Sequence, residues 1–503
     1  MEATPTPRKG TRPVGLPACL AVLRTAGPRA RVAFPAVVLG LVAAALVAMF
    51  AARGGSGQPP PTVPGGRLVD PYAWTPARDG ALVAAAARGT SHLLYTLSPG
   101  GAEASAARTA RWHALVVTAA HRARVDPGLL EGLVFLESAG RADAVTAAGI
   151  DGAVGLTQIL PETARDLLRM HVDVAASKRL TRRIERAQAR GRNRRVAALE
   201  RLRAAADQRF DPRASLGGTA RYLSLARARF GRQDLAFVSY HMGMGNLEGV
   251  LRAYGAGPGV SYARVYFDST PTRHAAAWRR LATFGDDSSN YLWKVMASRD
   301  LMALWRRDPA GLRRLAALQT AGDSAEHVLR PPASTPRFAD EDALKSAYDD
   351  GRLVPFPDRP AATGLRPMPA MAAAARRAGV DPKLFEGLRP EAMALALYVG
   401  AQTRALSGTG PLEVTATVRD AQAPAGDDEP PGSTALHDSG WSFDVRRRYR
   451  SPRQAQAFQF VLDRLQVLDV IAWSRQRSAI HVTVGAGARP LLPLLHRIGQ
   501  QTP

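Results

Sequence analysis

The residue with the clearest chemical potential is a glutamate at the end of a short apolar segment. In DPGLLEGLVFLESAG, Asp126 is placed to cap a helix and Pro127 to occupy its first position. Glu137 follows Leu133 by four residues and Leu130 by seven, so its carboxylate is expected on the apolar side of that helix. Among leucines a carboxylate loses hydration, which favours the protonated form and suits a proton donor near neutral pH. The alternative is a glutamate at a helix end that turns toward solvent.

Two further motifs follow this segment in order. Ser138 comes directly after Glu137, the glycine-rich segment GAVGLTQILPETA contains Gln158, and the segment SYHMG contains Tyr240. Together these motifs resemble the catalytic domain of the soluble-type lytic transglycosylases over roughly residues 110–255. The resemblance implies an α-helical, lysozyme-like domain that needs no cofactor for cleavage. It also implies Glu137 as the catalytic residue and Ser138, Gln158 and Tyr240 as substrate-binding residues.

The resemblance further implies a mechanism with a single carboxyl group, where most glycosidases use two. Glu137 first protonates the glycosidic oxygen between MurNAc and GlcNAc in peptidoglycan, while the N-acetyl group of the substrate stabilises the developing cation. Glu137 then acts as a base on the C6 hydroxyl and closes a 1,6-anhydroMurNAc ring without water. The predicted function is therefore that of a peptidoglycan lytic transglycosylase.

Departures from the family pattern leave two alternatives open. Thr157 and His241 stand where the family has other residues, and a short insertion lies near Asp151, so the shape of the sugar subsites is expected to differ. A hydrolytic, lysozyme-like muramidase is one alternative, because Asp151 or Asp143 would supply the second carboxylate that hydrolysis needs. A non-enzymatic peptidoglycan-binding scaffold is the other.

A second group of chemically suited residues lies near the C-terminus. His437 and Asp444 are spaced H-x-x-G-x-x-x-D, and His481 lies in the strand-like AIHVTV, so the three residues would bind one zinc ion. With Arg419 in an earlier strand, this pattern resembles the zinc D-alanyl-D-alanine carboxypeptidases and dipeptidases over roughly residues 370–490.

The metal motif departs from that family at one position. Three residues before the last histidine the peptidases carry an acidic base that acts on the metal-bound water, and this sequence has Ser478 there. The C-terminal domain is therefore an active peptidase, a non-catalytic module that binds wall peptides, or a domain with structural histidines.

An uncharged apolar run at residues 32–52 has the length that a helix needs to cross a bilayer. The basic residues before it place the N-terminus in the cytoplasm and the catalytic part in the periplasm, on a single-pass anchor in the cell inner membrane. A cleaved signal peptide is the alternative, and lipidation at Cys19, the only cysteine, is disfavoured because polar and basic residues precede it.

The formal net charge of +24 indicates an anionic partner. Almost all basic residues are arginine, which a GC-rich genome also produces. The sequence lacks a basic patch interleaved with aromatic residues, so nucleic acid is not expected as a partner. The predicted partners are peptidoglycan and the inner membrane.

These observations predict a multidomain chain, with a mainly α lysozyme-like catalytic domain after a single transmembrane helix and a smaller α+β C-terminal domain. The expected parts are a cytoplasmic basic tail (1–31), a transmembrane anchor (32–52), a Gly/Pro linker (53–70), the transglycosylase domain (71–307) with a basic helical insertion (177–208), a linker region (308–366) and a peptidase-like domain (367–503).

Overall fold

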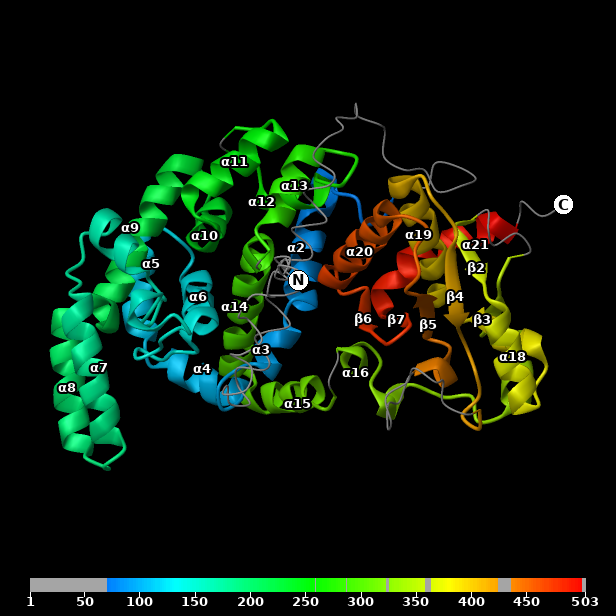
Figure 1. Cartoon of the computed structure of the whole chain (residues 1–503), viewed down its shortest axis with the longest axis horizontal. Coiled ribbons are helices and arrows are strands. Elements are labelled where there is room, and N and C mark those ends of the chain that lie inside the picture. The colour runs from blue at the N-terminus through cyan, green and yellow to red at the C-terminus, as the bar shows by residue number, and fades with distance from the viewer. Residues whose placement is uncertain are drawn as a thin grey trace, which may run out of the picture. The chain divides into compact units, whose positions relative to one another are not determined.

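The computed structural model describes residues 70–499, except for 258, 286, 323–324, 358–362 and 424–435. The described part is mainly helical with a smaller sheet region, as predicted (Figure 1). The expected tail and transmembrane anchor, and all of the expected linker except Asp70, lie outside the described residues. Within the described ranges, no helix combines the length and apolar character needed to span a membrane.

Helices alone form the first part of the described chain. Several begin with an Asp or Ser side chain that accepts a backbone N–H, such as Asp126, Asp173, Asp211 and Ser261. The helices are α2 (Asp79–Gly89), α3 (His92–Thr96), α4 (Ala102–Ala110), α5 (His113–Ala123), α6 (Pro127–Ser138), α7 (Val174–Gln188), α8 (Asn193–Ala206), α9 (Pro212–Phe230), α10 (Gln233–Met242), α11 (Met244–Tyr254), α12 (Tyr262–Asp268), α13 (Ala275–Thr283), α14 (Tyr291–Arg307) and α15 (Pro309–Gln319).

The short helix predicted around Glu137 is α6, and it packs closely against α14. Asp126 caps α6 as predicted, with its carboxylate 2.8 Å from the Leu129 backbone nitrogen. Leu130 is fully buried, in keeping with the expected apolar face. At Gly132 a side-chain carbon would lie only 2.5 Å from the Val295 carbonyl oxygen, so glycine is what allows α14 to approach α6.

The basic insertion consists of α7 and α8, joined by a short turn at Gly191. Ile184, Ala187 and Leu199 form the small apolar contact between the two helices. The exposed side of this pair of helices carries Arg179, Arg182, Arg183, Arg186, Arg190, Arg192, Arg194, Arg195 and Arg201. The insertion is thus held together by few apolar side chains and presents a strongly basic surface.

The last part of the chain combines helices with a five-stranded sheet in the order β2-β4-β5-β7-β6, in which only the β2–β4 pair is parallel. Its strands are β2 (Leu365–Pro367), β4 (Leu412–Ala416), β5 (Ser442–Arg446), β6 (Ile471–Arg475) and β7 (Ala479–Val484). Its main helices are α18 (Pro369–Ala378), α19 (Pro390–Ser407), α20 (Pro452–Val467) and α21 (Leu492–Gly499).

Alternation along β7 separates the two faces of this sheet. Ile480, Val482 and Val484 belong to the same apolar core as buried residues of α19 and α20. His481 and Thr483 therefore point to the opposite face, because successive side chains of a strand alternate. The polar side chains of β7 therefore lie on that second face.

The range 308–366, expected as a linker region, contains α15 and further short elements: α16 (Glu326–Leu329), α17 (Glu341–Asp349) and β1 (Val354–Pro355), which pairs with β3 (Gly387–Leu388). Phe338, Leu344 and Leu353 are buried in one cluster with Val380 and Phe385. Residues 338–353 therefore share a hydrophobic core with residues of the expected peptidase-like domain.

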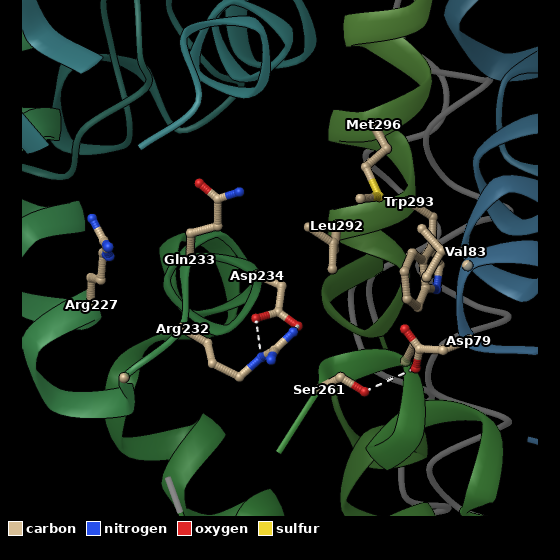
Figure 2. A pocket seen from close by; sticks show the side chains of 13 residues that line it. Asp79, Val83, Arg227, Arg232, Gln233, Asp234, Ser261, Leu292, Trp293 and Met296 are labelled. Carbon is tan, nitrogen blue, oxygen red and sulfur yellow. Dashed lines mark hydrogen bonds and ion pairs between the residues drawn. The ribbon is translucent and has the colours of Figure 1, made fainter. Parts of the chain in front are cut away.

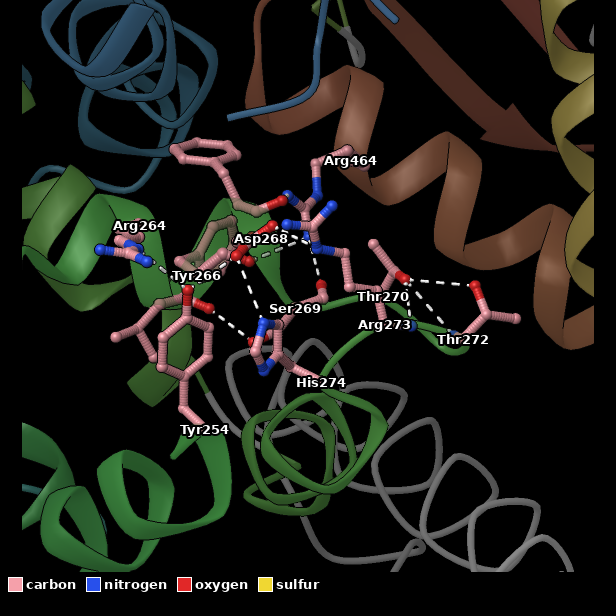
Figure 3. A network of polar contacts seen from close by, with 12 residues as sticks. Tyr254, Arg264, Tyr266, Asp268, Ser269, Thr270, Thr272, Arg273, His274 and Arg464 are labelled. Atoms are coloured by element: carbon pink, nitrogen blue, oxygen red, sulfur yellow. Dashed lines mark hydrogen bonds and ion pairs between the residues drawn. The ribbon is translucent and has the colours of Figure 1, made fainter. Parts of the chain in front are cut away.

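The helical part and the mixed part pack together through a network of polar contacts at the end of α12 (Figure 3). Arg464 of α20 donates hydrogen bonds of 3.0 Å to the carbonyl oxygens of Tyr266, Phe267 and Ser269. A helix leaves its last carbonyl groups without partners inside the helix, and the Arg464 guanidinium satisfies those of α12. At the start of the described chain, Tyr72 also donates a hydrogen bond to the Gly487 carbonyl oxygen.

Candidate functional site

The Glu137 side chain lies half-buried at the end of α6. Burial raises its pKa from the usual value near 4.5 to about 7, while a hydrogen bond from Tyr291 opposes this rise. Among the described residues no other carboxylate contributes to the shift. A carboxyl group whose pKa lies near 7 is partly protonated at neutral pH, so it can release a proton to a substrate oxygen and can also take one up.

Tyr291, the first residue of α14, contacts Glu137 directly and was not predicted from the sequence. Its hydroxyl donates a hydrogen bond of 2.6 Å to Glu137 Oε1 across 154 positions of sequence. Its ring stacks on His241, with centroids 5.0 Å apart. No sequence spacing signals this contact, because it depends on the close packing of α14 against α6 at Gly132.

We expect Tyr291→Phe to raise the pKa of Glu137 further. The Tyr291 hydroxyl stabilises the charged carboxylate, so its loss leaves the effect of burial unopposed. A pH titration of the Glu137 carboxyl carbon by carbon-13 NMR measures this, with Tyr348→Phe, a half-buried tyrosine that donates to the Leu384 carbonyl oxygen, as the matched control. A pKa of Glu137 that is unchanged in Tyr291→Phe contradicts the expectation.

The three predicted substrate-binding residues all hold the loop at residues 155–158. Ser138 Oγ donates to the Leu156 carbonyl at 2.8 Å, Gln158 Nε2 to the Gly155 carbonyl at 2.8 Å, and the Tyr240 hydroxyl to the Thr157 carbonyl at 2.8 Å. The structure thus brings them together around one loop beside Glu137. Their binding of sugar stays a prediction.

Tyr240 and Gln158 each show a further property that connects them with the site. The Tyr240 hydroxyl lies near enough to Glu137 that, after burial, the Glu137 charge is a cause of its raised pKa. Gln158 has a φ of 51°, in the left-handed region that side chains other than glycine rarely adopt. Such local strain persists only where surrounding contacts enforce it, as the hydrogen bonds of this loop do.

A buried ion pair between Arg209 and Asp207 supports the segment that contains this loop. Arg209 and Asp207 are both inaccessible to solvent, and Arg209 Nη2 lies 2.8 Å from Asp207 Oδ2. Arg209 also donates to the carbonyl oxygens of Ile150, Gly152 and Ile159, at 3.0, 3.0 and 3.3 Å. One guanidinium therefore fixes the glycine-rich segment through its backbone.

A cavity of about 620 Å³ lies elsewhere in the helical part, between α2, α10 and α14 (Figure 2). Its charged groups pair with each other or with neighbours: Arg232 with Asp234 at 2.9 Å, and Ser261 with Asp79 at 3.0 Å. Glu137 does not line it. We place the candidate site at Glu137 because a raised pKa coincides there with the residues of the predicted motifs.

The sheet face opposite α19 and α20 carries the second group of predicted residues. His437, Asp444 and His481 are buried, and their donor atoms lie within 4.8 Å of one another, an arrangement that can hold a metal ion. Asp444 Oδ1 lies 2.7 Å from His481 Nδ1 and 3.3 Å from His437 Nε2. Pairing of β5 with β7 places Asp444 directly opposite His481.

The tautomer of His437 suits a ligand. Its Nδ1 lies 2.7 Å from the Thr417 carbonyl oxygen, which can only accept a hydrogen bond, so Nδ1 carries a proton. His437 Nε2 is then the atom that faces Asp444 and His481. Nitrogen and carboxylate donors of this kind fit zinc.

Ser478 stands at the position of the acidic base in the peptidase pattern and does not supply one, and Arg419 is the strand arginine of that pattern. Ser478 is exposed just before β7, and its carbonyl oxygen accepts from the Arg447 backbone. Arg419 donates its backbone N–H to the His437 carbonyl oxygen at 3.3 Å. The acidic residue that does contact the metal-binding group is Glu326 of α16, which sequence reasoning missed because it lies 155 positions from His481.

Neither a scan against protein-family models nor a search of curated proteins found a match for this chain.

Proposed function

We propose that this protein is a peptidoglycan lytic transglycosylase with Glu137 as its single acid and base. The proposal rests on one observation above all: a half-buried carboxyl group with a pKa of about 7, hydrogen-bonded to Tyr291. The ordered motifs that resemble the soluble-type lytic transglycosylases support it, since Ser138, Gln158 and Tyr240 gather around the loop next to that carboxyl group.

The reaction proceeds in two proton transfers. Glu137 gives its proton to the glycosidic oxygen, the bond from MurNAc C1 to that oxygen breaks, and GlcNAc leaves with a new hydroxyl group. The Glu137 carboxylate then takes the proton of the MurNAc C6 hydroxyl as the C6 oxygen bonds to C1. Glu137 is protonated again at the end, so the reaction consumes no water molecule and needs no second carboxylate.

The single-carboxyl route is favoured over hydrolysis by the surroundings of the two aspartates considered above. Asp151 is exposed, with its carboxylate 2.6 Å from Lys178 Nζ, and Asp143 is exposed as well. Neither contributes to the pKa shift of Glu137. A retaining or inverting hydrolase needs its second carboxylate beside the scissile bond.

The products of wall digestion decide between the two routes. We expect the purified chain to release muropeptides that end in 1,6-anhydroMurNAc, lighter by one water than the products of a hydrolytic muramidase run in parallel. Mass spectrometry of the separated products measures the difference. Products that carry the additional water would show that the chain is a hydrolase and would exclude the transglycosylase route.

For the C-terminal part we propose a zinc ion held by His437 Nε2, Asp444 Oδ1 and His481 Nδ1, the atoms that converge on the polar face of the sheet. A bound zinc ion would supply a Lewis acid there. Because Ser478 stands at the base position, the favoured role is binding of wall peptides rather than their hydrolysis. We also retain, as proposals, anchoring in the inner membrane through residues 32–52 and a catalytic part in the periplasm.

A further inference from the structure

The short helix α16 places a carboxylate against the metal-binding group. Glu326 Oε1 lies 3.1 Å from His481 Nε2 and 2.8 Å from Thr483 Oγ1. Glu326 also accepts a backbone hydrogen bond from Leu436, the residue before His437. One carboxylate thus touches β7 and the turn that carries the first histidine.

The two ring nitrogens of His481 face different partners. Nδ1 faces Asp444 Oδ1 at 2.7 Å, and Nε2 faces Glu326 Oε1 at 3.1 Å. The nitrogens of an imidazole point away from each other, so Nδ1, on the side of Asp444, is the atom that would bind a metal ion together with Asp444 and His437. Nε2 would then keep its proton and donate a hydrogen bond to the Glu326 carboxylate.

We propose that Glu326 is a positioning residue of the metal site, which fixes the orientation and tautomer of His481 so that Nδ1 binds the metal. Metal-binding histidines commonly donate their other ring N–H to a carboxylate, and that partner strengthens binding. Glu326 does not replace the base missing at Ser478, because it bonds on the side of the imidazole that faces away from Asp444. This inference rests on the proposed zinc site.

Arg330, the residue after α16, attaches the end of this helix to the sheet. Arg330 Nε donates to the Val484 carbonyl oxygen at 2.7 Å, and its guanidinium lies 3.3 Å from the centre of the Trp441 ring. The helix that carries Glu326 is therefore fixed at its C-terminal end. A supporting residue on a fixed element positions a ligand more precisely.

Zinc affinity of the full-length chain tests the proposal. Zinc stoichiometry and affinity are measured by competition with a chromophoric chelator for wild type, Glu326→Gln and Glu326→Ala. We expect Glu326→Ala to bind zinc at least about tenfold more weakly and Glu326→Gln to lose less, since the amide oxygen still accepts from Nε2. The matched control is Glu341→Gln, a partly exposed glutamate of α17 paired with Lys345, which should leave affinity unchanged.

Nitrogen-15 NMR of the imidazole rings gives a second readout that needs no variant. In the zinc-loaded wild type, His481 should show a protonated Nε2 and a metal-bound Nδ1. The opposite tautomer overturns the proposal even if Glu326→Ala fails to fold.

The outcomes test the role of Glu326 separately from the proposed zinc site and the proposed transglycosylase activity. If the wild type takes up no zinc, both the zinc site and the role of Glu326 are rejected. If the wild type binds zinc and folded Glu326→Ala binds it equally well, only the role of Glu326 is rejected. Neither result touches the transglycosylase proposal, which depends on Glu137 and is measured by products.

Discussion

Glu137→Gln should reduce wall cleavage by about 10³-fold or more, since in the proposed mechanism one side chain supplies both proton transfers, and each such role typically contributes 10²–10⁴-fold. The amide preserves the shape of the side chain and can still accept the Tyr291 hydrogen bond. It can neither give a proton to the glycosidic oxygen nor take one from the C6 hydroxyl. A zymogram and a quantitative release assay with wild type alongside measure the loss.

Stability measurements show whether Glu137→Gln loses activity only because it unfolds. Folding raises the pKa of Glu137, so the folded state holds its proton to a higher pH than the unfolded state does. Glu137 therefore lowers the free energy of unfolding as pH rises from about 4.5 through about 7. Glu137→Gln should therefore be at least as stable as wild type at pH 8. Glu162→Gln, an exposed glutamate near Arg165, is the matched control for activity. Equal clearing by Glu137→Gln and wild type would leave Glu137 without a catalytic role.

Arg209→Met should lower the free energy of unfolding by about 3–5 kcal/mol, the typical loss when one partner of a buried ion pair is removed. Asp207 would remain inaccessible to solvent without its partner, and three backbone carbonyl groups would lose their donor. Chemical denaturation measures the change. Activity should fall as well, because the loop with Gln158 loses its support.

A double variant separates the effect of an unpaired buried charge on stability from the effect of lost packing at Arg209 and Asp207. Asp207→Asn combined with Arg209→Met removes both buried charges, so we expect it to recover part of the stability that Arg209→Met loses. A change below about 1 kcal/mol in Arg209→Met, within the range of an exposed ion pair, would show that the pair does not hold the loop.

Local signals explain how much of the site could be predicted from the sequence. The cap at Asp126 and the spacing of Leu130, Leu133 and Glu137 suffice to predict α6 and its apolar side, because both depend on neighbours in the chain. The Tyr291 contact depends instead on which helix packs against α6. That choice is made by tertiary packing at Gly132, which no periodicity records.

In the C-terminal domain, too, local patterns could be predicted from the sequence and tertiary contacts could not. Alternation in AIHVTV is enough to place His481 and Thr483 on one face of β7, and the H-x-x-G-x-x-x-D spacing is enough to suggest Asp444 as their neighbour. Which element covers that face was not predictable. The covering helix α16 has four residues, too few for a helical period, and lies in a region that was expected to be a linker.

The hydrogen bond from Tyr72 to the Gly487 carbonyl joins positions 415 residues apart. Contacts of such separation form late, because a large loop must close before they bring any gain. Residues at the start of the described chain are synthesised before the rest of it, yet they complete their packing only after the last strand and its following turn have emerged. Until then the side of α2 that packs against α20 stays uncovered, and apolar surface left exposed during synthesis favours aggregation.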